Sequence, residues 1–218
     1  ARAIAWLDGR LPDRVDAAPP KGTPYFLFTH IYGPHTPYTP PARFPKTDPY
    51  DGEVEYSDYI VGTLLEHLRT KGVYDDTTIV LFSDHGEGLG DHGEEEHGIF
   101  LYRETTHVPL IVKLPGSRGA GRRVATPVQH IDLVPTMLEL IGRGDSADHP
   151  GRSLLPLLEG TGEVATASIY SEWLSPRYHF GWSELYALSD ERYRLIRAPA
   201  DELYDLAQDP KELESIAD

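Results

Sequence analysis

The sequence of 218 residues contains no cysteine. This absence excludes disulfide bridges, cysteine-ligated zinc and a cysteine nucleophile within these residues, although it does not fix the cellular compartment. No run of about 18 apolar residues is present, so no membrane-spanning segment is expected. Positive charge is scarce, because 20 Lys and Arg stand against 35 Asp and Glu, a net charge of -15. That balance argues against nucleic acid or an anionic membrane as a partner. An anionic substrate would need local positive charge from a metal ion, histidine or arginine.

The stretch 77–98, TTIVLFSDHGEGLGDHGEEEHG, holds the main candidate site. Its apolar run 79–82 indicates a strand buried in a parallel sheet. Asp84, His85 and Gly86 follow at once, and ligands of open α/β sheets bind beyond the carboxyl ends of strands. A glycine bend would let both side chains reach one point. A carboxylate and an imidazole suit a divalent cation. The alternative is a hydrogen-bonded aspartate at a strand end beside a surface histidine.

Three familiar motifs are excluded in the same stretch. The segment 88–93 matches GxGxxG, but acidic residues and no helical pattern follow it, which argues against a dinucleotide site. Residues 83–85 are contiguous and cannot form the relay of a Ser-His-Asp triad. His92 and His97 do not have the HExxH spacing of zinc proteases. The acidic run 94–96 is interpreted as a solvated face.

The apolar patterns predict an α/β fold with a mixed, largely parallel sheet flanked by helices. Residues 25–30 and 108–112 read as further buried strands, and 52–70 and 130–141 as helices. The order strand, helix, strand over 25–82 predicts a right-handed βαβ unit.

The pattern changes near residue 161, where short alternating runs replace continuous apolar ones. This change predicts a small antiparallel sheet. The predicted division is a main α/β domain over residues 1–160 and a small C-terminal subdomain over 161–218.

A second candidate lies in the proline-rich loop after residues 25–30. The loop GPHTPY contains His35, which we expect on a stiff turn at the same sheet edge as Asp84. A single histidine at a strand end, such as His30, is more often structural than catalytic.

These residues resemble the sulfatase family of the alkaline-phosphatase-like superfamily. The SDHGE…GDHG block and HVPLIVKLPG are the specific motifs, and the similarity covers nearly the whole chain. The stretches that carry it are 26–38, 75–93, 101–116, 130–142, 170–173 and 191–215. The resemblance implies the family fold, a large mixed sheet between helices with a small C-terminal antiparallel sheet.

The resemblance also implies a chemistry. Family members hydrolyse sulfate esters, and relatives act on phosphate or phosphonate esters. Their nucleophile is a formylglycine made from a Cys or Ser in a C/S-x-P-S-R motif, and an Asp-Asp pair near the N-terminus supplies metal ligands. Neither motif occurs here. The chain therefore resembles the C-terminal half of such an enzyme, and the formylglycine is expected in the missing half.

The match implies a role for four residues. Asp84 and His85 would be metal ligands. His85 stands where many sulfatases have Asn. Two assignments of the metal therefore stay open: Ca2+, which is usual in the family, and Mn2+ or another transition metal. His35 matches the histidine that contacts the sulfuryl group or the leaving oxygen. His97 stands where many members have a substrate-binding Lys, and both histidines are predicted as catalytic and substrate-binding.

The predicted function is metal-assisted hydrolysis of a small-molecule or carbohydrate sulfate ester, with no turnover by the isolated fragment. Two alternatives stay open: a phosphonate monoester or phosphodiester hydrolase of the same superfamily, and a non-catalytic sulfatase-like binding module. An exposed apolar face is also expected, which would allow the chain to form oligomers.

Overall fold

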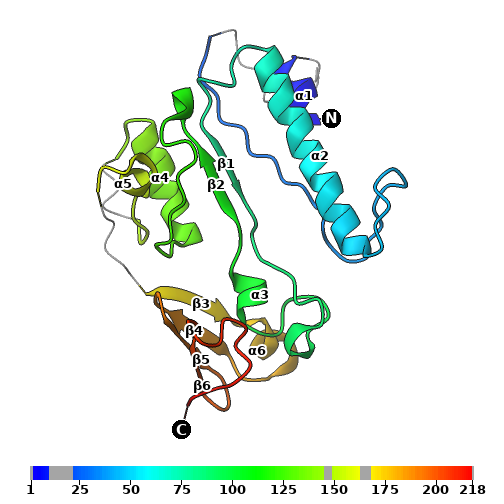
Figure 1. Ribbon diagram of the computed structural model, residues 1–218, viewed down its shortest axis with the longest axis vertical. Coiled ribbons are helices and arrows are strands. Elements are labelled where there is room, and N and C mark those ends of the chain that lie inside the picture. Colours follow the sequence, from blue (N-terminus) through cyan, green and yellow to red (C-terminus); the bar gives the residue numbers. More distant parts are fainter. Residues whose placement is uncertain (1, 10–21, 145–148, 163–167, 218) are drawn as a thin grey trace. The chain divides into compact units, whose positions relative to one another are not determined.

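The computed structural model describes residues 2–9, 22–144, 149–162 and 168–217 (Figure 1). The chain divides into two compact units, Ala1–Thr77 and Thr78–Asp218. The predicted division between residues 160 and 161 stays a prediction.

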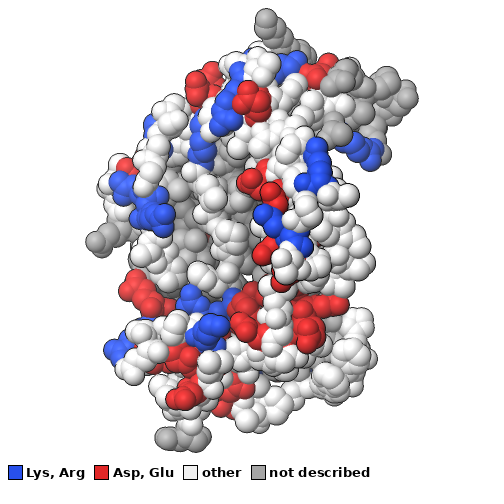
Figure 2. Space-filling model, turned by 45° about the vertical axis from the view of Figure 1, so that its right-hand side comes forward, with Lys and Arg blue, Asp and Glu red and all other residues white. Residues whose placement is uncertain are grey.

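On the face drawn in Figure 2, Lys and Arg side chains are scattered among Asp and Glu side chains and do not form a single band. None of the helices in the described ranges has both the length and the apolar character needed to cross a bilayer.

The first unit contains α1 (Arg2–Leu7) and the long helix α2 (Pro49–Thr70). Helix α2 begins three residues before the predicted 52–70 because Asp48 caps it. The Asp48 carboxylate accepts a hydrogen bond of 2.9 Å from the Tyr50 amide, and Pro49 occupies the first helical turn, where it needs no amide hydrogen. Gly72, with φ of +69°, follows the end of the helix.

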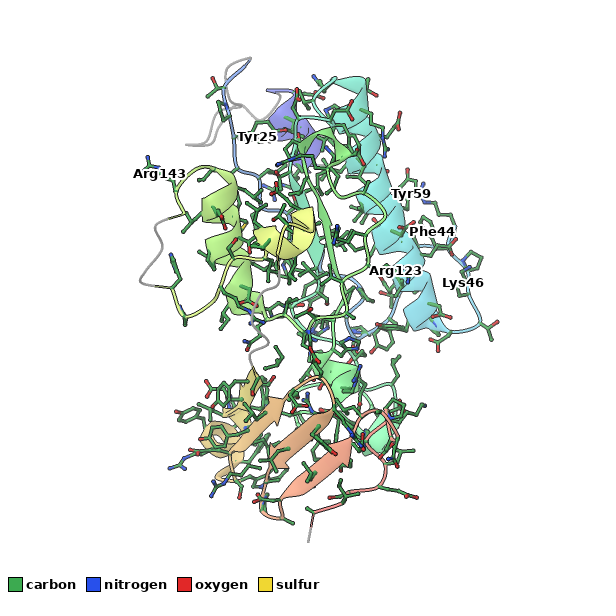
Figure 3. All side chains as sticks on the ribbon, turned by 60° about the vertical axis from the view of Figure 1, so that its left-hand side comes forward. Tyr25, Phe44, Lys46, Tyr59, Arg123 and Arg143 are labelled. Atoms are coloured by element: carbon green, nitrogen blue, oxygen red, sulfur yellow. The ribbon has the colours of Figure 1, made fainter. Side chains whose placement is uncertain are left out.

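One face of α2 anchors the preceding proline-rich loop. Phe44 is buried, and its ring centroid lies 5.3 Å from that of Tyr56 and 5.6 Å from that of Tyr59. Figure 3 labels Phe44 and Tyr59 beside α2. The Ser57 hydroxyl donates a 3.0 Å hydrogen bond to the carbonyl of Gly33. The helix therefore fixes the backbone around the loop that carries His35.

Residues 25–30 were predicted to form a strand, and this prediction is wrong for the described residues. The segment forms neither helix nor strand, and Phe26 and Phe28 are 75% and 68% exposed. A strand needs a hydrogen-bonded neighbour, which the local pattern cannot reveal. The predicted βαβ unit is consequently not formed.

The second unit begins with a two-stranded sheet. Strand β1 (Ile79–Phe82) lies where it was predicted, and β2 (Leu110–Lys113) overlaps the predicted 108–112. Neither strand contains a fully buried residue, so their predicted burial is wrong for the described residues. They pair antiparallel, with Ile79 opposite Lys113 and Phe82 opposite Leu110. The parallel partner predicted for 79–82 was the segment 25–30, whereas the strand that pairs with β1 is the antiparallel β2. The segment between the strands contains only a short 3-10 helix (Asp91–Gly93) and α3 (Arg103–Thr106), and no long crossover helix.

The predicted helix 130–141 is divided in two. A 3-10 helix (His130–Asp132) leads into α4 (Leu133–Leu140). The buried Asp132 carboxylate accepts 2.9 Å hydrogen bonds from the amides of Gln129 and Arg152. A 3-10 helix (Pro115–Ser117) precedes this region, and α5 (Leu155–Glu159) follows it.

The C-terminal antiparallel sheet is confirmed. Its strands, in the order β3-β4-β5-β6, are β3 (Ile169–Trp173), β4 (Leu185–Ser189), β5 (Tyr193–Arg197) and β6 (Glu202–Asp205), with α6 (Ser175–Phe180) between β3 and β4. Alternate buried positions form its core with Leu101, which lies outside the sheet. The segment after His97 is therefore packed against the sheet.

Candidate metal and ester site

Asp84 and His85 lie immediately beyond β1, and their side chains converge. The Asp84 Oδ1 accepts a 3.1 Å hydrogen bond from the His85 amide, and the same oxygen lies 4.0 Å from His85 Nε2. Both side chains are largely exposed. A carboxylate oxygen and an imidazole nitrogen therefore face a common point at the end of a strand.

A backbone acceptor orients the His85 ring. Its Nδ1 lies 2.8 Å from the carbonyl oxygen of Gly86, so the hydrogen on Nδ1 is donated to that carbonyl. This assignment of the tautomer leaves the lone pair on Nε2, the nitrogen nearer Asp84. A histidine that donates one nitrogen to a carbonyl and binds a metal through the other is a common arrangement in metal sites.

Gly86 is required by close packing rather than by the bend that the sequence suggested. Its φ is not in the left-handed region. A Cβ at this position would collide with the carbonyl of Glu104. The Gly86 amide donates to the Thr105 carbonyl at 2.8 Å, and the Glu87 amide donates to the Glu104 carbonyl at 3.0 Å. The start of the loop is thus held against α3.

His97 joins the pair from the far end of the loop. Its ring centroid lies 4.0 Å from that of His85, and its Nδ1 lies 2.9 Å from Glu87 Oε1. The Glu87 residue is only 8% exposed. The structure therefore brings together Asp84, His85 and His97, and it adds Glu87, which sequence reasoning missed because an acidic residue in a glycine-rich loop looks solvated.

The pair Asp84 and His85 fits a divalent cation as two of its ligands. Metal–ligand bonds to oxygen and nitrogen are about 2.0–2.6 Å, so two ligands of one ion lie within about 4.5 Å of each other. The observed separation of 4.0 Å satisfies this limit. No cluster of three or more metal-binding side chains occurs in the described ranges, so these two residues would need further ligands.

The acidic run 94–96 is not uniformly solvated. Glu94 is 5% exposed, and its carboxylate accepts hydrogen bonds from the amides of Ile99 at 2.6 Å and Phe100 at 3.3 Å. Burial raises the pKa of the Glu94 carboxyl, against the effect of those amides. Glu95 and Glu96 are exposed, as predicted. Glu94 therefore closes the loop around His97.

His130 is another residue near the site that sequence reasoning did not select. Its Nε2 lies 2.9 Å from the carbonyl oxygen of Ser83, and its ring packs 5.6 Å from that of Phe82. It thus contacts the backbone just before Asp84. No local sequence signal links two residues so far apart in the chain.

His35 lies in the first unit, whereas Asp84 lies in the second. Its ring stacks on Tyr32 with centroids 4.7 Å apart, and its Nδ1 lies 2.7 Å from the carbonyl oxygen of Thr36. These contacts fix the ring within its loop. The expectation that His35 shares the edge of Asp84 stays a prediction.

Comparison with known families gives two matches that overlap. The family described as sulfatase matches residues 7–143, and the C-terminal region of N-sulphoglucosamine sulphohydrolase matches residues 90–218. Among curated relatives, an N-acetylglucosamine-6-O-sulfatase of Bacteroides thetaiotaomicron is 32% identical over 167 residues, covering 73% of this chain and 30% of the relative.

Solved structures give the same fold. A protein in complex with its substrate D-glucosamine-2-N,6-O-disulfate is 30% identical, with a TM-score of 0.69 over 77% of this chain and 35% of that one. The phosphonate monoester hydrolase of Agrobacterium radiobacter is also 30% identical, with a TM-score of 0.68 over 78% of this chain and 36% of that one. The chain thus spans about a third of the length of these proteins.

Proposed function

This chain belongs to the sulfatase family and has the alkaline-phosphatase-like fold, and from that membership we propose that it forms part of a metal-assisted hydrolase of sulfate esters. The observation that carries the proposal is the meeting of Asp84, His85 and His97 beyond β1. A carboxylate with two imidazoles at a strand end is a site for chemistry on an anionic ester.

The residues suit the charge that develops in the reaction. Attack on sulfur places negative charge on the non-bridging oxygens and on the departing oxygen. A divalent cation held by Asp84 and His85 would supply charge stabilisation there. Glu87 accepts the hydrogen of His97 Nδ1, so Nε2 is the nitrogen that exchanges a proton or hydrogen bond with the ester. His35 is proposed to contact the sulfuryl group or the leaving oxygen.

The nucleophile is proposed to come from polypeptide outside these residues. The sequence contains no C/S-x-P-S-R motif, and the chain spans 30% of the length of its Bacteroides relative. A formylglycine in the remaining part would complete the site. The 218 residues alone should then show no turnover of an aryl sulfate.

A phosphonate monoester or phosphodiester hydrolase is the second candidate. His85 in place of the Asn of many sulfatases favours it, as does the likeness to a phosphonate monoester hydrolase. A non-catalytic binding module is the third, and a missing C/S-x-P-S-R segment in the complete polypeptide would support it. A sulfated carbohydrate is the proposed substrate class, since one structural neighbour binds a disulfated glucosamine.

The test is a comparison of matched esters. The protein with a complete site should be assayed on sulfate and phosphonate esters of one phenol, with Asp84→Ala as the control. Higher kcat/KM for the sulfate supports the proposal, and the reverse order supports the second candidate. Binding of both esters without turnover by the intact protein supports a binding module.

A further inference from the structure

His92 lies within the loop between His85 and His97, and both of its ring nitrogens face acceptors. Nδ1 lies 2.6 Å from Glu104 Oε1, and Nε2 lies 2.9 Å from the carbonyl oxygen of Glu212. The ring also stacks on Tyr102, with centroids 3.7 Å apart and planes 11° apart. A neutral imidazole has one N–H, so only the imidazolium can donate to both acceptors.

Glu212, the partner of His92 in the C-terminal tail, is also fixed by its contacts. Glu212 is 1% exposed, and its Oε2 accepts a 2.8 Å hydrogen bond from the Arg103 amide. Its Oε1 lies 3.2 Å from Arg194 Nε, an ion pair without hydrogen-bond alignment. The backbone is in the left-handed region at both His92 and Glu212, with φ of +53° and +56°. Such backbone is uncommon outside glycine and persists only where its surroundings hold it.

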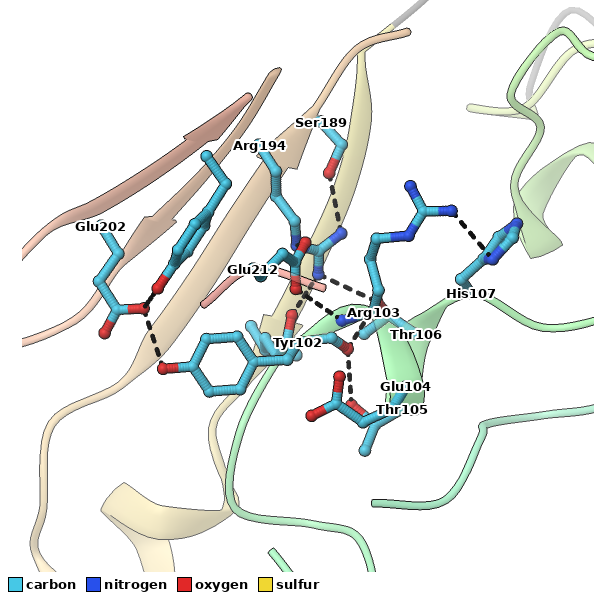
Figure 4. Close-up of polar contacts among 12 residues, drawn as sticks. Tyr102, Arg103, Glu104, Thr105, Thr106, His107, Ser189, Arg194, Glu202 and Glu212 are labelled. Carbon is cyan, nitrogen blue, oxygen red and sulfur yellow. Dashed lines mark hydrogen bonds and ion pairs between the residues drawn. The ribbon is translucent and has the colours of Figure 1, made fainter. Parts of the chain in front are cut away.

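Arg194, on β5, connects this tail to the segment around α3 (Figure 4). Its guanidinium donates to the carbonyl of Leu101, to Thr106 Oγ1 at 3.0 Å and to Ser189 Oγ at 2.9 Å. The tail, the sheet and α3 therefore meet at one buried polar cluster.

Glu104 joins this cluster to the candidate site. Its carboxylate binds His92, while its carbonyl accepts the 3.0 Å hydrogen bond of the Glu87 amide. The Glu87 carboxylate in turn binds His97. The loop is also tied across itself, because the Gly88 amide donates to the Glu96 carbonyl at 2.6 Å.

We propose that His92 and Glu212 are positioning residues, which form a protonation-dependent clasp between the C-terminal tail and the loop that carries His97. The clasp itself follows from the contacts of the second unit. Its effect on catalysis rests on the proposed function, since His97 must act on the ester for its placement to matter.

The charges around His92 set the direction of the pH dependence. Burial disfavours the imidazolium, but the Glu212 carbonyl, the Glu104 carboxylate and the Glu212 charge together hold the pKa of His92 above its ordinary value. Glu104, Glu212 and Tyr102 are the titratable groups that face it, and Arg103 and Arg194 face Glu212. The clasp is therefore complete below about pH 6.5, the pKa of an unperturbed histidine, and it is lost as pH rises through the raised pKa of His92.

The test is amide hydrogen exchange of residues 87–97 in the wild-type protein as a function of pH, corrected for intrinsic rates. Protection should fall as pH rises through the His92 pKa, which the imidazole NMR shifts of the same sample report. The variant His92→Asn tolerates left-handed backbone but carries no charge. It should have low protection at every pH, at least about fivefold below wild type in acid. The exposed His179 on α6 provides the control His179→Asn, which should follow wild type.

The wild-type pH series needs no mutant, so a failure of His92→Asn to fold leaves the test intact. Protection that does not change while His92 titrates would overturn the clasp, whatever the activity. An enzyme that follows the predicted exchange but does not cleave sulfate esters would retain the clasp and refute the proposed function. In an active wild-type enzyme, kcat should fall as pH rises through the His92 pKa, because the clasp is lost. The variant His92→Asn should lower kcat more than it changes KM and should remove that pH-dependent fall. An unchanged kcat profile would contradict the positioning role.

Discussion

The buried carboxylate of Glu87 holds the imidazole of His97, with Oε1 and Nδ1 2.9 Å apart. The Glu87 side chain is only 4% exposed, and its backbone is bound to α3 through the Glu104 carbonyl. Because the acceptor cannot move freely, the ring of His97 is fixed beside that of His85. The orientation of a predicted catalytic group thus depends on a residue two positions after a predicted metal ligand.

Replacement of Glu87 should therefore lower activity without removing the metal site. Glu87→Ala should reduce kcat/KM for the preferred ester by about 10–100-fold, as is typical for partners that orient site ligands. Glu87→Gln retains an oxygen acceptor and should lose less. The exposed Glu96 gives the control Glu96→Gln, which should stay within about twofold of wild type. Equal losses of kcat/KM in Glu87→Gln and Glu87→Ala would contradict the expectation that an uncharged oxygen acceptor at this position still orients the His97 ring.

The identity of the metal ion should depend on His85. Imidazole suits transition metals, whereas Ca2+ prefers oxygen ligands. Titration calorimetry with the metal-free protein should show tighter binding of Mn2+ than of Ca2+, and His85→Asn should weaken Mn2+ by at least about tenfold while it changes Ca2+ less. A parallel loss of both ions would contradict a selective role for this nitrogen.

Gly86→Ala should destabilise the second unit because the new Cβ would collide with the Glu104 carbonyl. Crowding of this kind typically costs about 1–3 kcal/mol. The matched control is Gly62→Ala in α2, where the added Cβ has no neighbour within 4 Å apart from the adjoining residues and backbone of its own helix. That substitution should be neutral or stabilise by up to about 1 kcal/mol, since alanine favours helices. Denaturant unfolding followed by far-UV dichroism measures both, and a neutral Gly86→Ala would refute the close approach.

The buried ion pair of Arg194 and Glu212 should be much more sensitive than an exposed one. Removing one partner of a buried pair typically costs about 3–5 kcal/mol, because the other charge is left without compensation. Arg194→Met should therefore lower the free energy of unfolding by about that amount. Arg192 pairs with Asp205 at 2.7 Å but is more than half exposed, so Arg192→Met should cost less than about 1 kcal/mol. The free energies of unfolding are measured by chemical denaturation. Similar losses in the two variants would show that burial does not set the strength of these ion pairs.

Features that depend on local sequence patterns could be predicted, whereas features that depend on contacts between distant residues could not. Apolar and alternating patterns placed β1 and predicted the small C-terminal antiparallel sheet, since the periodicity of a strand is a local signal. The direction of the β1 pairing was wrong because neighbours in a sheet are chosen by the whole fold. The strand expected at 25–30 failed for the same reason.

In the candidate site, too, the residues whose roles depend on the folded structure could not be predicted. The family resemblance selected Asp84, His85 and His97, and the three side chains lie close together. Glu87 and Glu94 were not selected because an acidic residue among glycines is normally solvated. Their burial is set by amides and a ring nitrogen supplied by the folded loop. His92 was seen only as one of several histidines, because its partner Glu212 is 120 residues away.

Asp84 and His85 are proposed to bind one divalent cation jointly. Anomalous diffraction at the manganese absorption edge, from crystals of the protein grown with Mn2+, tests this proposal most directly. We expect a single strong peak within about 2.0–2.4 Å of both an Asp84 carboxylate oxygen and His85 Nε2. A manganese peak elsewhere, or one bound by only one of the two side chains, would contradict the claim.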